Sequence, residues 1–326
     1  MGGATGLLPT GATGGDEGFH LLAAQLINAG KRPYIDFFYQ HTPLYAYLNA
    51  GWMRVFGESW RSAHALAALL TGGCIVQVAS FVFSRFREPG WRLAGGITAA
   101  LLVGLHLQVI RMGTVAQPYA LCMFLSVASF RLVIEAVDQP RSFQPLWAGV
   151  CAGAAAASSL LAAPVGPLLF LWMVRHNRAG DRLKKCAQFL GGAAVPFLPL
   201  LWLAVQAPRQ VLFDVVEFHL FYRTWGVSTR VLAFHNLAVL TAWLNSAQGL
   251  LLTRLAAVGL VFLGERGGWD ARRRAEFSLC AWLTGGLGMY LATPYPTYLW
   301  YFVLLIPFLG ILAAVGAYAS GSRVWT

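Results

Sequence analysis

Acidic, basic and imidazole side chains gather near the start of this 326-residue chain. Asp16 and Glu17 are adjacent, and Asp36 and His41 follow within the next 25 residues. Carboxylates can take a proton from an attacking hydroxyl or hold a metal ion, and His or Arg can bind phosphate oxygens. The segment therefore carries the residue types needed to activate a hydroxyl beside an anionic group.

Structural interpretations remain open for these residues. Asp16 could cap the helix predicted after it, with Glu17 complementing the helix dipole. His41 could be a solvated loop histidine. Arg111 closes the outer end of a predicted span, where it is either a snorkelling arginine or a phosphate contact. Arg223 lies in a second polar stretch, and it could complete a site or simply be solvated.

The elements that must position these residues are membrane spans. Hydrophobic residues make up 57% of the chain and charged residues only 11%, whereas soluble domains carry about 25% charged residues. The net charge of +11 does not indicate nucleic-acid binding, because the basic residues form no stripe among solvent-facing polar ones. The five cysteines lie in or beside apolar runs without metal-ligand spacing, which favours small buried hydrophobes over disulfides.

Crossing the hydrocarbon core takes roughly 20 mostly apolar residues. The stretch Leu146–Val174 is too long for one span, and its prolines Pro164 and Pro167 would break a single helix. We therefore predict two short helices that meet near Ser158 and Ser159. The other predicted spans are Ser62–Phe83, Leu93–Ile110, Val115–Glu135, Cys186–Gln206, Ala247–Leu263, Phe277–Ala292 and Leu299–Tyr318.

The distribution of positive charge supports this hairpin and gives an orientation. With the hairpin, 14 of the 24 Lys and Arg residues fall in loops on one side of the membrane, which the positive-inside rule makes cytoplasmic. A single span would reverse that asymmetry. We predict an all-α, multi-pass protein of the cell membrane with about nine crossings, an outer N-terminus and a cytoplasmic C-terminus.

Two outer segments then stand apart from the spans. Residues 1–61 form a first extracytoplasmic loop with the Asp-Glu pair, followed by a transmembrane domain over residues 62–326 whose second outer loop covers residues 207–246. Within the first loop, Leu44–Phe56 has apolar residues at helical spacing, with Asn49 and Arg54 turned away. This pattern predicts an amphipathic helix lying in the membrane interface.

The first loop contains four motifs in a fixed order, namely Asp16-Glu17-Gly18, Gly30 with Pro33-Tyr34-Ile35-Asp36, His41-Thr42-Pro43-Leu44-Tyr45 and Phe56-Gly57-Glu58-Ser59. Near the last predicted span, Tyr295-Pro296-Thr297-Tyr298 is followed by Ile306-Pro307-Phe308. This set of motifs closely resembles the polyprenyl-phosphate-sugar-dependent membrane glycosyltransferases of the GT-C fold, which include protein O-mannosyltransferase-like and aminoarabinose-transferase-like enzymes. The short hairpin near Ser158 fits the same family.

The resemblance implies an inverting transfer of one sugar from a lipid-linked phosphate donor to an acceptor on the outer face. Asp16 would be the general base. Glu17, Asp36 and His41 would position the acceptor, the donor or a divalent cation, while Arg111 and Arg223 are candidates to hold the leaving phosphate. The expected partners are membrane lipid, a polyprenyl-phosphate sugar as co-substrate, and a glycan, lipid or protein acceptor; no fixed metal site and no nucleic acid are expected.

The sequence departs from the family pattern at three places. Family members usually carry one more span before the Asp-Glu pair, whereas fifteen residues precede Asp16, so we expect that span to be missing here. Gln117-Pro118 stands where an acidic residue is common, and Ser158-Ser159 replaces a common lysine. The alternative to an enzyme is a non-catalytic flippase or transporter. We favour the enzyme because transporters usually place charges near the midplane, whereas these acids cluster outside.

Overall fold

The computed structural model describes residues 15–86, 89–138, 143–223, 225–264, 269–294 and 296–324. In these ranges the chain is built of helices, with one isolated bridge between Pro33 and Phe37 and no β-strand. The all-α prediction is confirmed. Residues 1–14 and Tyr295, which entered the predictions above, lie outside the described residues.

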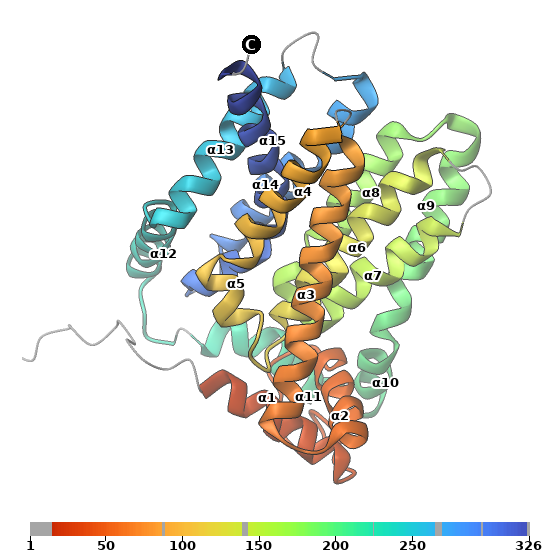
Figure 1. Cartoon of the computed structure of the whole chain (residues 1–326). Coiled ribbons are helices and arrows are strands. Elements are labelled where there is room, and N and C mark those ends of the chain that lie inside the picture. Colours follow the sequence, from red (N-terminus) through yellow and green to blue (C-terminus); the bar gives the residue numbers. More distant parts are fainter. Residues whose placement is uncertain are drawn as a thin grey trace, which may run out of the picture.

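Long helices lie side by side in a bundle, and the short helices of the first loop gather at the end opposite the C-terminus (Figure 1). That first-loop end contains α1 (Gly15–Asn28) and α2 (Leu44–Phe56). The bundle helices are α3 (Trp60–Arg85), α4 (Pro89–Gly104), α6 (Tyr119–Asp138), α7 (Gln144–Ser158), α8 (Val165–His176), α9 (Ala179–Ala194), α10 (Leu198–Gln206), α13 (Ala247–Gly264), α14 (Ala271–Leu291) and α15 (Ile306–Val324).

Five segments of the described chain are long and apolar enough to cross a bilayer, which makes this a multi-pass membrane protein. They are Trp60–Arg85, Tyr119–Val137, Gly180–Gln206, Ala247–Gly264 and Leu299–Ser322. The other predicted crossings fall on shorter or more polar helices, namely α4, α7, α8 and α14. The number of about nine crossings stays a prediction.

The hairpin predicted within Leu146–Val174 is present. Helix α7 ends at Ser158, a turn of 3₁₀ helix (Leu160–Ala162) follows, and Pro164 precedes α8. The proline sits where its missing N–H costs nothing, since the first turn of a helix leaves its amides without partners. The return of the chain here brings Ser159 to the first-loop end of the bundle.

One predicted span is wrong in detail. Leu93–Ile110 was expected to be continuous, but α4 ends at Gly104 and a separate short helix, α5 (Leu107–Met112), follows. Between them His106 adopts an extended conformation, and its Nδ1 accepts the Gln108 N–H at 3.2 Å. His106 thus caps the start of α5 and ends the continuous span. Hydropathy cannot detect such a break, because it does not report capping hydrogen bonds.

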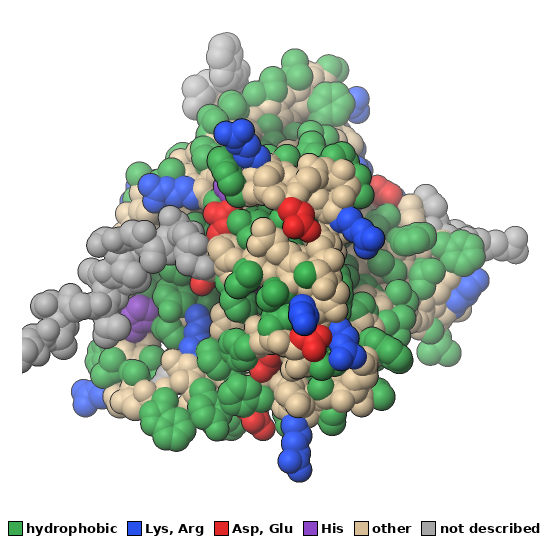
Figure 2. All heavy atoms as spheres, turned by 90° about the horizontal axis from the view of Figure 1, so that it is seen from below, with side chains coloured by type: hydrophobic (Ala, Val, Ile, Leu, Met, Phe, Trp, Pro, Cys, Tyr) green, Lys and Arg blue, Asp and Glu red, His purple; other side chains and the backbone are tan. Residues whose placement is uncertain are grey.

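Helix α2 has the bounds predicted from its periodicity. It exposes an apolar stripe that includes Leu48, Val55 and Phe56, while Asn49 is fully buried against the protein. An exposed stripe of this kind suits a helix that lies in the interface. The first-loop end of the molecule mixes hydrophobic, basic and acidic side chains (Figure 2).

Helices α7 and α9 approach each other through glycines. A Cβ added at Gly192 would lie 2.1 Å from the Leu146 carbonyl oxygen, and one added at Gly149 would lie 2.0 Å from the Phe189 carbonyl oxygen. Small residues allow such close backbone contact, which stabilises helix pairs in membranes by van der Waals packing.

We expect Gly192→Val to force α7 and α9 apart and to destabilise the fold by about 1–3 kcal/mol. Thermal unfolding in detergent, followed by size-exclusion recovery, measures this effect. The neighbouring Gly191→Val is the matched control, because a Cβ there meets no atom within 4 Å. Equal melting temperatures for the two variants would show that the close approach is not stabilising.

Candidate active site

The first turn of α1 presents two acids in different environments. The Glu17 carboxylate contacts His64 Nε2 of α3 and accepts the Ala116 backbone N–H at 3.2 Å. Asp16 is exposed. Because α1 begins at Gly15, both acids lie inside its first turn, where the helix dipole favours negative charge. Glu17 thus ties α1 to two neighbouring segments, and Asp16 keeps a carboxylate free of such contacts.

Asp16 lines a small cavity of about 110 Å³ at the junction of the first loop and the bundle. Four separate parts of the chain meet there: α1 with the loop behind it, the start of α6, the α7–α8 hairpin, and the C-terminal half of the chain. The lining residues are Asp16, His20, Gln40, His41, Gln117, Pro118, Tyr119, Ser159, Leu161, Phe218, Arg223 and Tyr301.

A larger cavity of about 510 Å³ adjoins the small one. The two share Gln40, His41, Ser159, Leu161, Arg223 and Tyr301. Apolar side chains dominate the rest of its wall, including Leu160, Val215, Val216 and Leu220. A polar chamber that contains a carboxylate therefore lies beside an apolar chamber, with the Arg223 guanidinium in the wall that they share.

Arg223 is the cation at this boundary. Its Nη2 donates a hydrogen bond to Tyr301 Oη at 3.1 Å, and its guanidinium lies 5.5 Å from the Tyr298 ring centroid. No carboxylate lies within ion-pair distance of it in the described parts of the chain. A partly buried guanidinium with no counter-charge is a ready site for a phosphate, which guanidinium binds through paired N–H donors.

Three histidines surround the same boundary. The His41 ring centroid lies 5.0 Å from that of His20 and 6.2 Å from that of His219. Burial lowers the pKa of His41 well below its ordinary value, and the nearby histidines and Arg223 lower it further. His219 Nε2 donates to the Gln40 carbonyl oxygen at 2.6 Å. Burial also lowers the pKa of His20 and of His219. The three rings are therefore neutral near pH 7, and they can donate or accept hydrogen bonds without adding positive charge.

The loop that carries His41 is fixed from several sides. Tyr34, which has a φ of 67°, donates its hydroxyl proton to the His41 carbonyl oxygen at 2.6 Å. The buried Asp214 accepts the Tyr39 backbone N–H at 2.9 Å. The Tyr39 hydroxyl lies 3.1 Å from His20 Nδ1. A left-handed tyrosine is uncommon, and these bonds hold the loop in that conformation beside the cavity.

Of the residues proposed from the sequence, Asp16, His41 and Arg223 come together in the small cavity. Asp36 lies outside this cavity and lines a separate groove. Its Oδ2 accepts the Arg32 backbone N–H at 2.7 Å, and this hydrogen bond holds the pKa of the Asp36 carboxyl below its ordinary value. Arg111 is exposed on α5 and lines none of the three cavities described here. Its phosphate role stays a prediction.

A resident metal ion finds little support in the donor set. Mg²⁺ and Ca²⁺ prefer several oxygen ligands. Asp16 is the one carboxylate that lines the small cavity among the described residues, and no cluster of three His, Cys, Asp or Glu side chains suited to a metal occurs in that part of the chain. A divalent cation in this cavity would therefore find a single carboxylate ligand among the described residues.

Residues 40–203, about half of the chain, match the family of dolichyl-phosphate-mannose-protein mannosyltransferases. The chain belongs to this family. No curated protein matches the chain.

The fold is similar to that of ArnT from Cupriavidus metallidurans. The crystal structure of ArnT bound to undecaprenyl phosphate aligns with a TM-score of 0.62 and 18% identity over 96% of this chain and 58% of ArnT. The apo structure aligns with a TM-score of 0.61 and 20% identity over 95% of this chain and 56% of ArnT. The chain thus spans less than three fifths of the length of ArnT, and the GT-C fold expected from the first-loop motifs is confirmed.

This family member also places residues in the cavity that the sequence did not single out. His20 lies one turn after Asp16 on the same helix, a spacing that could have indicated a shared face. Ser159 was predicted as the turn of the hairpin but not as a site residue. Tyr301 lies near the start of the last span and carries no local signal, because tertiary packing brings it to Arg223.

The buried His20 gives the fold a predicted sensitivity to acid. Burial lowers the pKa of His20 from 6.5 to about 3. Between these values the unfolded chain binds a proton at this position and the folded chain does not, so stability falls as the pH drops from 6.5 toward 3.

In the His20→Gln variant, the melting temperature should therefore fall less steeply between pH 6.5 and pH 3 than it does in the wild type. The slope that one such group contributes is at most about 1.4 kcal/mol per pH unit. Melting curves of the purified protein at several pH values test this, with each variant compared with its own value at pH 7.5. Parallel curves for wild type and variant would contradict the assignment.

Proposed function

We propose that this chain is a membrane glycosyltransferase that moves one sugar from a polyprenyl-phosphate donor to a hydroxyl acceptor on the outer face, with inversion at the anomeric carbon. The supporting observation is the position of Arg223, an unpaired guanidinium where the apolar cavity meets the polar cavity that holds Asp16. A lipid phosphate needs this combination, because its tail is apolar and its head is anionic.

The donor would be held by its two ends. The prenyl chain enters the apolar cavity, whose wall includes Val216 and Leu220, both exposed on their outer side. The phosphate then lies against Arg223 and the Tyr301 hydroxyl, and the sugar extends into the small cavity toward Asp16. His41 lines both chambers, so it can hydrogen-bond the phosphate or the first sugar hydroxyl.

The transfer itself needs one base and one charge stabiliser. The acceptor hydroxyl gives its proton to the Asp16 carboxylate while its oxygen forms a bond to the anomeric carbon. The bond from that carbon to the phosphate oxygen breaks, and its electron pair leaves with the polyprenyl phosphate. Arg223 stabilises the charge that grows on that oxygen. Attack from the side opposite the leaving group inverts the configuration, and a single carboxylate is sufficient.

The residues around the base have supporting roles. Glu17 fixes the first turn of α1 through His64 and Ala116, and it thereby orients Asp16 toward the cavity. The neutral His20 beneath it adds no cation that would weaken the basicity of the carboxylate. Outer-face chemistry agrees with the predicted orientation, in which the first loop lies outside and the basic loops lie in the cytoplasm.

A vesicle assay separates this proposal from a flippase. Purified chain is reconstituted with a polyprenyl-phosphate sugar labelled in both sugar and lipid, and a mixed extract of cell-envelope material supplies acceptors. An enzyme separates the two labels and releases free polyprenyl phosphate. A flippase moves both labels together across the bilayer. Movement without separation of the labels would refute the proposed function.

A further inference from the structure

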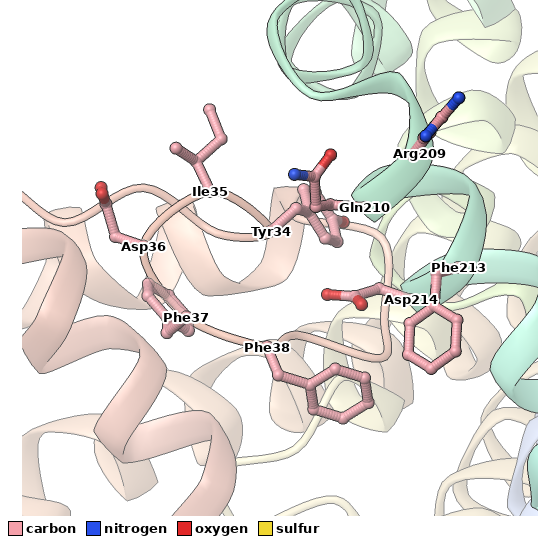
Figure 3. Close-up of a pocket in the computed structure, with 9 residues that line it drawn as sticks. All are labelled: Tyr34, Ile35, Asp36, Phe37, Phe38, Arg209, Gln210, Phe213 and Asp214. Atoms are coloured by element: carbon pink, nitrogen blue, oxygen red, sulfur yellow. The ribbon is translucent and has the colours of Figure 1, made fainter.

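A second groove lies on the first-loop end of the molecule, apart from the two chambers. It has a volume of about 480 Å³ and runs between the loop after α1 and the segment that follows α10. None of its lining residues lines either chamber. The lining residues are Tyr34, Ile35, Asp36, Phe37, Phe38, Arg209, Gln210, Phe213 and Asp214 (Figure 3).

Asp214 is the buried charge of this groove. It is only 4% exposed, and burial raises the pKa of its carboxyl although the Tyr39 N–H opposes this effect. Asp214 Oδ2 accepts a hydrogen bond from the Tyr39 backbone N–H. No basic side chain of the described chain lies within ion-pair distance of the Asp214 carboxylate. In Figure 3 the carboxylate points into the space enclosed by residues 34–38, while Asp36 and Arg209 extend away from it. Buried carboxylates in proteins are normally paired with a cation.

The walls of the groove suit a cation as well. The ring centroids of Phe38 and Phe213 lie 6.4 Å apart at the edge of the groove. Phe37 and Tyr34 also line the groove, so four aromatic residues contribute to its wall. Aromatic faces attract ammonium groups through their quadrupole, most strongly when water is excluded. A carboxylate among aromatic rings therefore favours an ammonium ligand over a neutral one.

The position of the groove indicates where that ammonium comes from. It begins three residues after Gln206, the last residue of the apolar segment Gly180–Gln206. The end of this segment is strongly exposed, with Trp202 at 67% and Val205 at 80%, so it faces lipid. Arg32 Nη1 donates to Gln206 Oε1 at 3.1 Å, which joins the first loop to the end of the span. The groove thus lies at headgroup depth beside a lipid-facing helix.

We propose that this groove binds a phospholipid headgroup that carries both a primary ammonium and a phosphate, as phosphatidylethanolamine does. Asp214 and the aromatic rings receive the ammonium, and the exposed Arg209 at the rim receives the phosphate. A primary ammonium donates hydrogen bonds to the carboxylate, whereas a quaternary choline cannot, and glycerol headgroups offer no cation.

Tyr39 connects this headgroup site with the small cavity. Its backbone N–H bonds Asp214 in the groove, and its hydroxyl contacts His20 beside Asp16. A lipid bound in the groove therefore stabilises the loop that carries His41. Phospholipid binding in this groove requires neither the sugar donor nor the acceptor, so it can be measured independently of sugar transfer.

Native mass spectrometry of the purified full chain tests the site directly. The probes are dioleoyl phosphatidylethanolamine, phosphatidylcholine and phosphatidylglycerol, each titrated into the delipidated protein. We expect phosphatidylethanolamine to bind roughly tenfold more tightly than either other lipid, because one charge-assisted hydrogen-bonded contact is specific to it. Equal affinity for the three lipids, or a preference for phosphatidylglycerol, would overturn the proposal.

Asp214→Asn is the decisive variant, because its amide oxygen can still accept the Tyr39 N–H while the charge is lost. It should lose the preference for phosphatidylethanolamine. Arg209→Gln should weaken all three phospholipids alike. Glu217→Gln removes an acid from the same helix outside the groove, and it should leave the preference intact. An unchanged preference in Asp214→Asn would overturn the proposal.

Soluble phosphoethanolamine gives a test that needs no variant and separates the headgroup from the acyl chains. It should displace phosphatidylethanolamine from the wild-type protein at millimolar concentration, and phosphocholine should displace it less. Failure of phosphoethanolamine to compete would show that the acyl chains alone hold the lipid and would contradict the headgroup assignment.

Discussion

Asp16→Asn is expected to lower the rate of sugar transfer by about 10²–10⁴-fold, the usual contribution of general acid–base catalysis. The amide is nearly isosteric with the carboxylate, but it cannot accept the proton of the acceptor hydroxyl. Because Asp16 is exposed and its side chain lines a cavity, the fold should not change. Donor affinity should stay within about threefold of wild type, since the phosphate lies at Arg223; each 1.4 kcal/mol of binding free energy corresponds to a factor of ten.

The control for this variant is Glu17→Gln, the neighbouring acid in the same turn. Its carboxylate already contacts His64 and the Ala116 N–H, so its loss should act through stability and through the placement of Asp16. Steady-state transfer rates and thermal melts, measured on the same preparations, distinguish the two. If Asp16→Asn transfers sugar at the wild-type rate, the base assignment is wrong.

Arg223→Gln should have the second largest effect, on donor binding. Charge-assisted hydrogen bonds contribute about 1.5–3 kcal/mol, so the dissociation constant for polyprenyl phosphate should rise roughly 10–100-fold. Arg223→Lys keeps the charge but not the paired donors, and it should recover part of the loss. Titration of the labelled lipid phosphate into the reconstituted protein measures these constants.

Arg230→Gln is the matched control for charge in the same outer loop. Arg230 is exposed and lies 5.8 Å from the ring centroid of Phe234, away from the chambers. Its loss should leave the dissociation constant unchanged. Equal weakening by the two variants would indicate a diffuse electrostatic attraction rather than a phosphate site at Arg223.

The sequence predicted those features that depend on local pattern. The bounds of Leu44–Phe56 follow from its apolar periodicity, and the break near Ser158 follows from Pro164. Asp16 and His41 were found because the first-loop motifs place both in one segment. Each of these depends on residues close in the chain, where spacing and backbone chemistry decide the outcome.

Other features could not be predicted because they depend on tertiary contacts or local competition. Asp36 was expected to position a substrate or a cation beside Asp16, but a turn pairs it with Arg32 and it lines a separate groove. Tyr301 joins Arg223 across the bundle without any local signal. The segment Phe213–Tyr222 forms a π-helix, whose pitch shifts the faces that an α-helical period would predict.

The anomeric configuration of the product tests the central claim most directly. A donor labelled with ¹³C at the anomeric carbon is incubated with the reconstituted chain and an acceptor, and the product is followed by NMR. The proposal predicts that the label moves from phosphate to acceptor oxygen with inverted configuration, in wild type and not in Asp16→Asn. Retained configuration, or a label that remains on phosphate while the intact donor crosses the bilayer, would contradict it.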